Sequence, residues 1–204
     1  MNFFYCDDSL ATCAQNLDDR RVTKMVLETA QLLNNCLVHH GDTTAPYRPT
    51  HMNHPSSVWC RTSPSNYQLM LNYFAYLCRE FELRRGKEHK CAEHYHTFVM
   101  FQWDLQLDDW DKPYGTPIPN CTDYKNVSST IKAYRLHLRD KWDVEYKAHE
   151  AGNWYQPVWT GRDMPDWYTY IPLRHIAADM PIFITETDRQ TLKEINSPLT
   201  GITG

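Results

Sequence analysis

The sequence predicts an all-α fold, a compact single-domain helical bundle with long ordered loops. Three observations support this prediction. Residues from about 18 to 38 follow helical periodicity, residues 64–85 lie between good helix-capping residues, and residues 131–150 have an apolar seam at helical spacing. A chain of 204 residues with 42% hydrophobic content is also long enough to bury one sizeable core.

The first predicted helix has one apolar and one polar face. Its polar residues fall in a narrow stripe at 100° per residue, which comprises Arg20, Lys24, Glu28, Gln31 and Asn35, with Arg21 at its edge. Such a stripe is often a solvated surface with ion pairs four residues apart, here Lys24 with Glu28. The uncharged amides Gln31 and Asn35 instead favour a face that lines a site.

The other elements follow from local signals. Ser63 is a candidate N-cap, Pro64 suits a first helical position, and Gly86 suits a left-handed C-cap. The many aromatic residues of this second helix predict burial on more than one side. Residues 91–110 begin as a helix, and Thr130 caps a third well-defined helix. We expect residues 1–172 to form the helical domain and residues 173–204 to form a C-terminal extension, with a small helix near 187–195.

Residues 47–67 combine prolines with groups suited to a binding site. Pro49, Pro55 and Pro64 predict a loop rather than a helix. His51 and His54 titrate near neutral pH, and Asn53 between them offers an amide that could recognise the edge of a base. The simpler alternative is that the histidines cap neighbouring helices and that Trp59 belongs to the core.

Charge is divided unevenly along the chain. The net charge is −4, which alone argues against non-specific binding to duplex DNA. Residues 20–90, however, hold ten basic and five acidic residues, so this part carries +5 and the remainder carries −9. An anionic ligand such as a nucleotide or a nucleic acid is therefore expected to bind the basic part.

Other site chemistries have weaker support. His51 and His54, or Cys91, His94 and His96, place metal ligands close together, but neither spacing supplies a known three- or four-ligand set, so we expect no metal or other cofactor. The seven scattered cysteines suit reduced thiols. No run of about 18 apolar residues predicts a membrane span, and no signal peptide is evident, so we expect a soluble cytoplasmic protein without a membrane partner.

A carboxylate beside cations and imidazoles suits cleavage at an anomeric carbon. Glu28 could stabilise an oxocarbenium-like sugar or activate water, while Arg20 and Arg21 hold flanking phosphates. An amine could also attack the sugar as a Schiff-base nucleophile. The candidates are Lys24 and the α-amino group of Met1.

Several stretches carry a resemblance to known proteins. RRVTKMVLETAQLL, PYRPTHMNHPSSVW, SNYQLM, CREFELRRGKEHK and TPIPNCTDYK followed by AYR resemble the pattern of a group of small phage proteins over residues 1 to about 168. More distantly, the order of parts resembles the pyrimidine-dimer DNA glycosylases, which are small all-helical repair enzymes without a metal. The shared parts are a first helix with Arg and Glu, a long helix ending in Arg85-Gly86, and a late P-x-W-Y at 165–168.

The distant resemblance implies roles for particular residues. In those enzymes a glutamate of the first helix is catalytic, arginines hold DNA, and a late aromatic segment contacts the lesion; Glu28, Arg20, Arg21, Trp167 and Tyr168 match best. Those enzymes also use the amine of a threonine exposed by loss of the initiator Met. Here Asn2 is large and should leave Met1 in place, and the basic excess of those enzymes is missing.

We therefore predict a DNA glycosylase-like enzyme that cleaves an N-glycosidic bond in damaged or modified DNA, possessing lyase activity if an amine attacks. A cytoplasmic phage-encoded protein would act in the infected host cell. The alternatives are an enzyme acting on nucleotides or nucleotide sugars, and a non-catalytic nucleic-acid-binding or anti-defence phage protein. The predicted catalytic residues are Glu28, Lys24, His51 and His54. The predicted substrate-binding residues are Arg20, Arg21, Gln31, Asn53, Trp59, Asn66, Arg84, Arg85, Lys87, His89, Trp167 and Tyr168.

Overall fold

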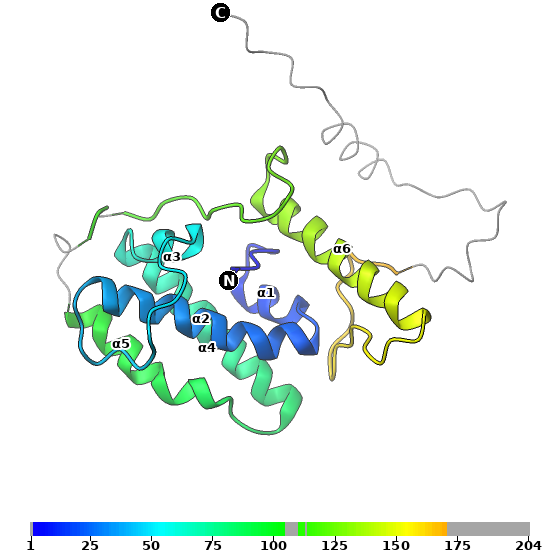
Figure 1. Cartoon of the computed structure of the whole chain (residues 1–204), viewed down its shortest axis with the longest axis horizontal. Helices are drawn as coiled ribbons and strands as arrows, with labels where there is room; N and C mark the ends of the chain where they lie inside the picture. The colour runs from blue at the N-terminus through cyan, green and yellow to red at the C-terminus, as the bar shows by residue number, and fades with distance from the viewer. Residues whose placement is uncertain (1, 105–109, 113, 171–204) are drawn as a thin grey trace, which may run out of the picture.

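The computed structural model describes residues 2–104, 110–112 and 114–170, and every element of regular structure in these ranges is a helix (Figure 1). The helices are α1 (Leu10–Asn16), α2 (Asp19–His39), α3 (Pro55–Cys60), α4 (Pro64–Arg85), the short 3₁₀ helix η1 (Lys90–His94), α5 (Tyr95–Asp104) and α6 (Thr130–Glu150). The all-α prediction is thereby confirmed. Within the described ranges, none of the helices combines the length and apolar character that a membrane span requires.

Helix α4 has the boundaries that its capping residues predict. The Ser63 hydroxyl accepts the backbone N–H of Asn66 at 3.1 Å, Pro64 is the first helical residue, and Gly86 closes the helix with a φ of 65°. Only a residue without a Cβ adopts this left-handed conformation at little cost. The start of α6 differs by one position from the prediction. Ser129 rather than Thr130 is the N-cap, because its hydroxyl accepts the N–H of Lys132.

Two short helices were not predicted. Helix α1 begins after Ser9, whose side chain accepts the N–H of Thr12. Helix α3 lies inside the segment that its prolines were expected to keep out of a helix. Pro55 does not prevent it because proline is tolerated at the first helical position, where its missing N–H would have no intrahelical partner. The predicted helix near 187–195 and the C-terminal extension fall outside the described residues.

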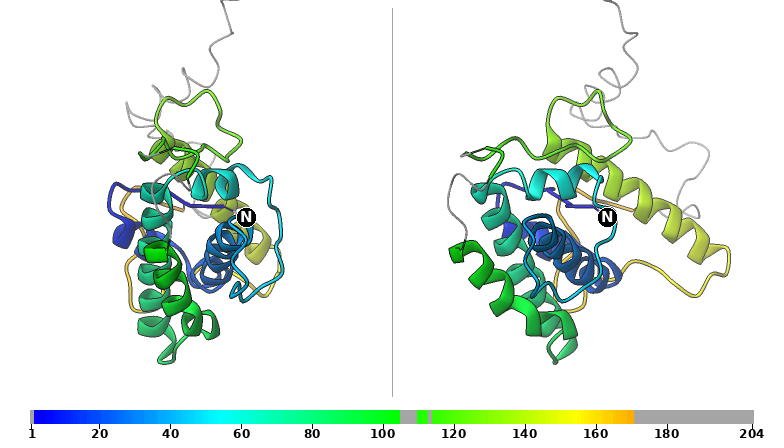
Figure 2. Two further views of the ribbon diagram at one scale, coloured as in Figure 1. Left: turned by 90° about the vertical axis from the view of Figure 1, so that its left-hand side faces the viewer. Right: turned by 60° about the vertical axis from the view of Figure 1, so that its left-hand side comes forward.

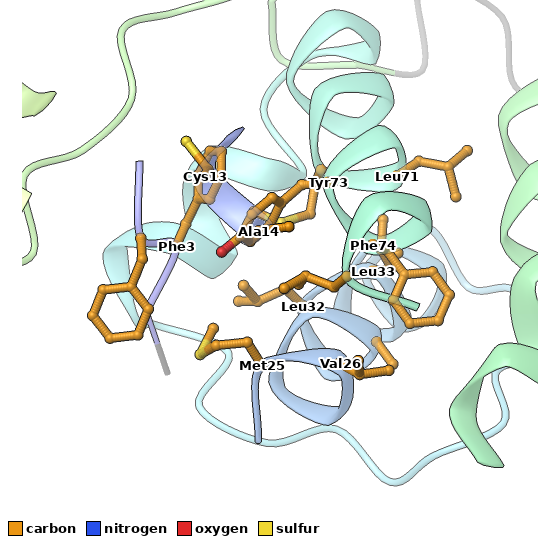
Figure 3. Packing of buried hydrophobic residues seen from close by; sticks show 14 of the residues in the cluster. Phe3, Cys13, Ala14, Met25, Val26, Leu32, Leu33, Leu71, Tyr73 and Phe74 are labelled. Atoms are coloured by element: carbon orange, nitrogen blue, oxygen red, sulfur yellow. The ribbon is translucent and has the colours of Figure 1, made fainter. Parts of the chain in front are cut away.

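The core lies where α2 crosses α4, with α1 and α3 packed against the pair and α5 along one side (Figures 1 and 2). Figure 3 shows Met25, Leu32 and Leu33 of α2 near Tyr73 and Phe74 of α4. The N-terminal segment also enters this core. Phe3 has no exposed surface, and its ring packs 4.8 Å from that of Tyr73.

Helix α6 joins this body mainly through side chains and through the segments on either side of it. Trp142 is fully buried and donates its indole N–H to Asp18, at the N-terminal end of α2, at 2.9 Å. Beyond α6, the chain returns to the body, where the Trp159 indole donates to the Asn16 carbonyl at 2.9 Å. Helix α6 and its returning segment therefore stand beside α2 with a cleft between them, which holds the candidate site.

Candidate active site between α2 and α6

A pocket of about 240 Å³ lies between α2, the N-terminal segment and α6. It contains four of the predicted site residues, all from the polar stripe of α2. The pocket is lined by Arg20, Arg21, Lys24, Met25 and Glu28 of α2, Asn2 and Phe4 of the N-terminal segment, and Lys141 and Glu145 of α6. The first half of the polar stripe of α2 therefore lines a pocket rather than an open solvated surface.

Glu28 occupies a protected position in this pocket. Its side chain is 15% exposed, and its Oε1 lies 3.2 Å from Lys24 Nζ, one helical turn away. Its Oε2 accepts the backbone N–H of Asn2 at 3.3 Å. Burial of Phe3 in the core and of Phe4 against Tyr134 fixes the N-terminal segment beside this carboxylate. The segment thus supplies a hydrogen-bond donor to Glu28 at a fixed place.

Accessible cations surround the pocket. The side chains of Arg20 and Lys24 are 60% and 68% exposed, and Lys141 is exposed on the α6 side. Arg20 also lies over the ring of Tyr155, 4.9 Å from its centroid. Arg20 also lies 3.8 Å from Glu145, and Lys24 lies 3.2 Å from Glu28, so an anionic ligand at the pocket would compete with these carboxylates for the two cations. Phosphate groups are the ligands that such an arrangement of Arg and Lys favours.

Arg21, by contrast, is used to hold the two walls together. Its side chain is 10% exposed, and it donates to Asp18 at 2.7 Å and to both carboxylate oxygens of Glu145 at 2.9 and 3.1 Å. Burial opposes the charged form, but Asp18 and Glu145 outweigh it and raise the pKa of Arg21. The predicted substrate-binding role of Arg21 is therefore replaced by a brace between α2 and α6.

The loop that carries His51, Asn53 and His54, called the histidine loop below, does not line the pocket. His54 is the N-cap of α3, and its Nδ1 accepts the backbone N–H of Ser56 at 3.2 Å, as the simpler alternative predicted. Burial chiefly lowers the pKa of His54, and His51 lowers it further, whereas the negative charge of Glu28 acts in the opposite direction. The capping bond leaves the proton of neutral His54 on Nε2, so this nitrogen is a hydrogen-bond donor.

His51 and Asn53 are both exposed. His51 has a φ of 52°, a left-handed conformation that costs a residue other than glycine about 1–3 kcal/mol. Its Nδ1 lies 2.7 Å from the Thr50 hydroxyl. The backbone on its N-terminal side is held by Asn35, which donates to the Thr50 carbonyl at 2.7 Å and accepts the Thr50 N–H at 3.2 Å.

The amides of α2 therefore hold the loop rather than contact a ligand. Asn35 is fully buried, which corrects its interpretation as a site-lining residue, and Asn34 makes a similar pair of bonds with Tyr47. Gln31 lies partly buried on the same side of α2, outside the residues that line the pocket. The position of the histidine loop is thus fixed from α2, the same helix that carries Glu28.

Two predicted substrate contacts belong to the core. Trp59 is 6% exposed and donates its indole N–H to the Thr116 carbonyl at 2.9 Å. Asn66 is 2% exposed, and its amide bonds the Trp59 carbonyl and both the backbone N–H and the hydroxyl of Thr116. Both residues attach the extended segment around residue 116 to α3 and α4, so neither presents a free group to a ligand.

The late aromatic pair also faces inward. Trp167 stacks on Trp142 with centroids 5.5 Å apart, and Arg135 lies over its ring. Tyr168 is 1% exposed and donates its hydroxyl to Asp143 at 2.9 Å. Tyr168 therefore belongs to the core, and Trp167 packs on α6 while remaining partly exposed.

The basic cluster at the end of α4 divides into different roles. Arg84 has a side chain 2% exposed, where it bonds Glu80 and Asp19, so it is a buried structural residue. His89 caps η1 through its Nδ1. Arg85 and Lys87 are exposed and could bind phosphate, although Arg85 also lies 3.8 Å from Asp19. None of the four lines the pocket at Glu28.

Sequence reasoning missed the α6 side of the site. Lys141 and Glu145 line the pocket, and His137 precedes Lys141 by one turn on the same face of α6. The His137 ring stacks on Phe4, its Nε2 is buried without a hydrogen-bond partner, and burial lowers its pKa. The signal was the spacing of four residues from 137 to 141 to 145, which indicates one helix face. Nothing local indicated that this face meets α2.

Two further observations complete the description of the site. In the ranges that the structure describes, no three His, Cys, Asp or Glu side chains gather in a group that could hold a metal ion. All seven cysteines are free thiols, and Cys60 is fully buried.

We expect the protein to lose stability as the pH falls below about 6.5. A histidine in an unfolded chain has a pKa of about 6.5. The pKa values of His54 and His137 in the folded protein lie below it. The unfolded chain therefore binds more protons in this window, and the free energy of unfolding decreases until the pH lies below the folded pKa values. Urea unfolding at about pH 7.5 and about pH 5.5 measures the loss.

A substitution assigns this pH dependence. His137→Gln should reduce the loss of stability between the two pH values, because it removes an imidazole whose pKa burial lowers. Equal stability of the unchanged protein at both pH values would contradict the assignment.

Comparison of the chain with protein-family models, with curated proteins and with solved structures finds no match.

Proposed function

We propose that this protein is a DNA glycosylase-like enzyme that cleaves an N-glycosidic bond in damaged or modified DNA. The observation that carries the proposal is the position of Glu28, a largely buried carboxylate in a pocket whose most exposed charged groups, Arg20, Lys24 and Lys141, are cations. Cleavage of an N-glycosidic bond develops positive charge on the sugar, which a carboxylate stabilises, and a phosphate on each side of that sugar needs cations. The pocket supplies both.

The reaction follows from these groups. The bond between C1′ and the base nitrogen breaks, and the electron pair leaves with the base, which takes up a proton. Water then adds to C1′ and gives up a proton, which Glu28 accepts as the general base in this proposal. Alternatively, the neutral Lys24 amine, 3.2 Å from Glu28, adds to C1′ in place of water and gives up one proton. The C1′–O4′ bond then breaks, O4′ takes up a proton, and the Schiff base that forms between C1′ and the amine nitrogen gives the lyase reaction. Met1, the other candidate amine, lies outside the described residues.

The size of the pocket limits what it can enclose. A volume of about 240 Å³ is smaller than the roughly 300–1,000 Å³ typical of pockets that enclose drug-sized ligands. It suits one base or one sugar, with the rest of the substrate outside against Arg20, Lys24 and Lys141. This division agrees with a substrate that inserts a single nucleotide into the site.

A second candidate is an enzyme that acts on free nucleotides or nucleotide sugars. The net charge of −4 favours it, because a protein that binds long DNA non-specifically usually carries a basic excess. In this case the three exposed cations would hold the phosphates of one small molecule rather than those of a strand.

Release of free base from a substrate panel tests the proposal. The panel contains single- and double-stranded DNA with ultraviolet lesions, abasic sites or modified bases, together with free nucleotides and nucleotide sugars. Chromatography detects released base, and borohydride trapping detects a Schiff base. Base release from DNA supports the glycosylase, and release from nucleotides alone supports the second candidate. Binding of DNA without release of base from any substrate would indicate a non-catalytic binding protein.

A further inference from the structure

Trp154 is exposed to an unusual degree for a tryptophan. Its exposed fraction is 86%, whereas Trp59, Trp110, Trp142 and Trp159 are each below 10%. Burying a large apolar side chain stabilises a protein, so a tryptophan left in solvent forgoes that stabilisation. A fixed, solvent-facing indole is therefore a candidate for contact with a ligand.

The loop that carries Trp154 is held in place on both sides. Before it, Asn153 donates its N–H to the Ala148 carbonyl at 2.9 Å, and its own carbonyl lies 2.8 Å from His149 Nδ1. After it, Tyr155 donates its hydroxyl to the buried Asp18 at 2.6 Å. Because these bonds fix the residues on either side, Trp154 projects outward as part of an ordered turn and not as part of a frayed end.

Arg20 connects Trp154 to the Glu28 pocket. Arg20 lines the pocket, and its guanidinium lies over the Tyr155 ring at 4.9 Å. The Tyr155 ring in turn meets the Trp154 ring at 5.7 Å in an edge-to-face arrangement. An indole, a tyrosine and an arginine thus lead continuously from solvent to the pocket.

We propose that Trp154 stacks on a base next to the nucleotide whose sugar lies at Glu28, so that the substrate is a polynucleotide strand and not a free nucleotide. This inference rests on the proposed function and selects between its two candidates. The flat face of one indole matches one base, and Arg20 beside it complements the phosphate between the two nucleotides. A protein partner fits less well, because the neighbouring loop residues Gly152, Asn153 and Gln156 are polar or small and make no contiguous apolar patch.

Binding measurements with Trp154 variants test the inference. A fluorescein-labelled single-stranded oligodeoxythymidylate is titrated with the protein at low salt, and dTMP competes as the mononucleotide probe. Every variant is made in a Glu28→Gln background, so that turnover does not alter the probe. We expect Trp154→Ala to weaken oligonucleotide binding about 5- to 150-fold, the factor that corresponds to stacking of one base. Trp154→Phe should retain most of the affinity, because a phenyl ring still stacks.

The mononucleotide separates this inference from a general binding defect. Affinity for dTMP should be the same with Trp154 or Ala at position 154. Oligonucleotide affinity that is unchanged in Trp154→Ala, or reduced equally in the Phe and Ala variants at an unchanged melting temperature, would overturn the inference. An equal loss for dTMP would overturn it as well.

Failure of the strand contact and failure of the proposed function give different results. Trp154-dependent oligonucleotide binding without base release from any substrate would support the strand contact and contradict the glycosidase. Base release from an oligonucleotide that is the same with Trp154→Ala in an otherwise unchanged chain would support the proposed glycosylase and contradict the strand contact.

Discussion

Arg84→Met is expected to destabilise the protein by about 3–5 kcal/mol, the cost of removing one partner from a buried ion pair. The Arg84 side chain is 2% exposed, and it donates to Glu80 at 2.7 Å and to Asp19 at 3.0 Å. It also bonds the carbonyls of Leu17 and Gln15. Methionine fills similar space but supplies no donor to these four oxygens, so Glu80 and Asp19 keep only their remaining partners, among them Arg162 and Thr160. Such a loss is a large fraction of the roughly 5–15 kcal/mol that stabilises a typical domain.

Arg85→Met is the matched control, because it removes the same charge from the next residue. Arg85 is 41% exposed and lies 3.8 Å from Asp19, a pair that contributes no more than about 1 kcal/mol. Denaturant unfolding monitored by circular dichroism gives both free energies. Equal effects of the two substitutions would show that Arg84 is not the structural centre of this network.

The helices with strong local signals were predictable from the sequence. Helix α4 begins and ends where Ser63, Pro64 and Gly86 place its caps, because capping depends on residues within one turn of each end. Helix α3 was missed because Pro55 has two interpretations. It interrupts a helix from inside but favours one from the first position, and the deciding residue was His54, which acts as the N-cap.

The candidate site was predictable on one side only. Arg20, Lys24 and Glu28 share a face of α2 through helical periodicity alone, and they do line one pocket. Lys141 and Glu145, which complete it, come from a helix more than a hundred residues later in the chain. No local pattern encodes that proximity.

Burial of charge was the other property that the sequence did not reveal. Arg84 and Arg85 are adjacent and identical in type, yet one is 2% and the other 41% exposed. The difference arises because Asp19, from α2, and Arg162, from the segment after α6, reach the same carboxylate network from distant parts of the chain. The exposure of aromatic residues is equally hard to predict from the sequence. Trp167 stacks on Trp142, whereas the Trp154 side chain is 86% exposed.

Glu28→Gln is expected to reduce base release by about 10²- to 10⁴-fold, the range that general acid–base catalysis contributes. Glutamine keeps the shape of the side chain, and its oxygen can still accept the N–H of Asn2, but it neither takes up a proton from water nor balances a positive sugar. The ion pair with Lys24 is lost, which costs only about 0.3–0.5 kcal/mol at this spacing. The melting temperature should therefore stay nearly unchanged while activity falls.

Glu82→Gln provides the control, because it makes the same chemical change at an exposed position of α4 outside the pocket. Single-turnover base release from the best substrate of the panel, with each protein in excess, measures chemistry apart from product release. Full activity in Glu28→Gln would exclude the carboxylate from the mechanism. Loss of trapping by borohydride in Lys24→Met, but not in Glu28→Gln, would then leave the Lys24 amine as the group that attacks the sugar, with Glu28 only holding it in place.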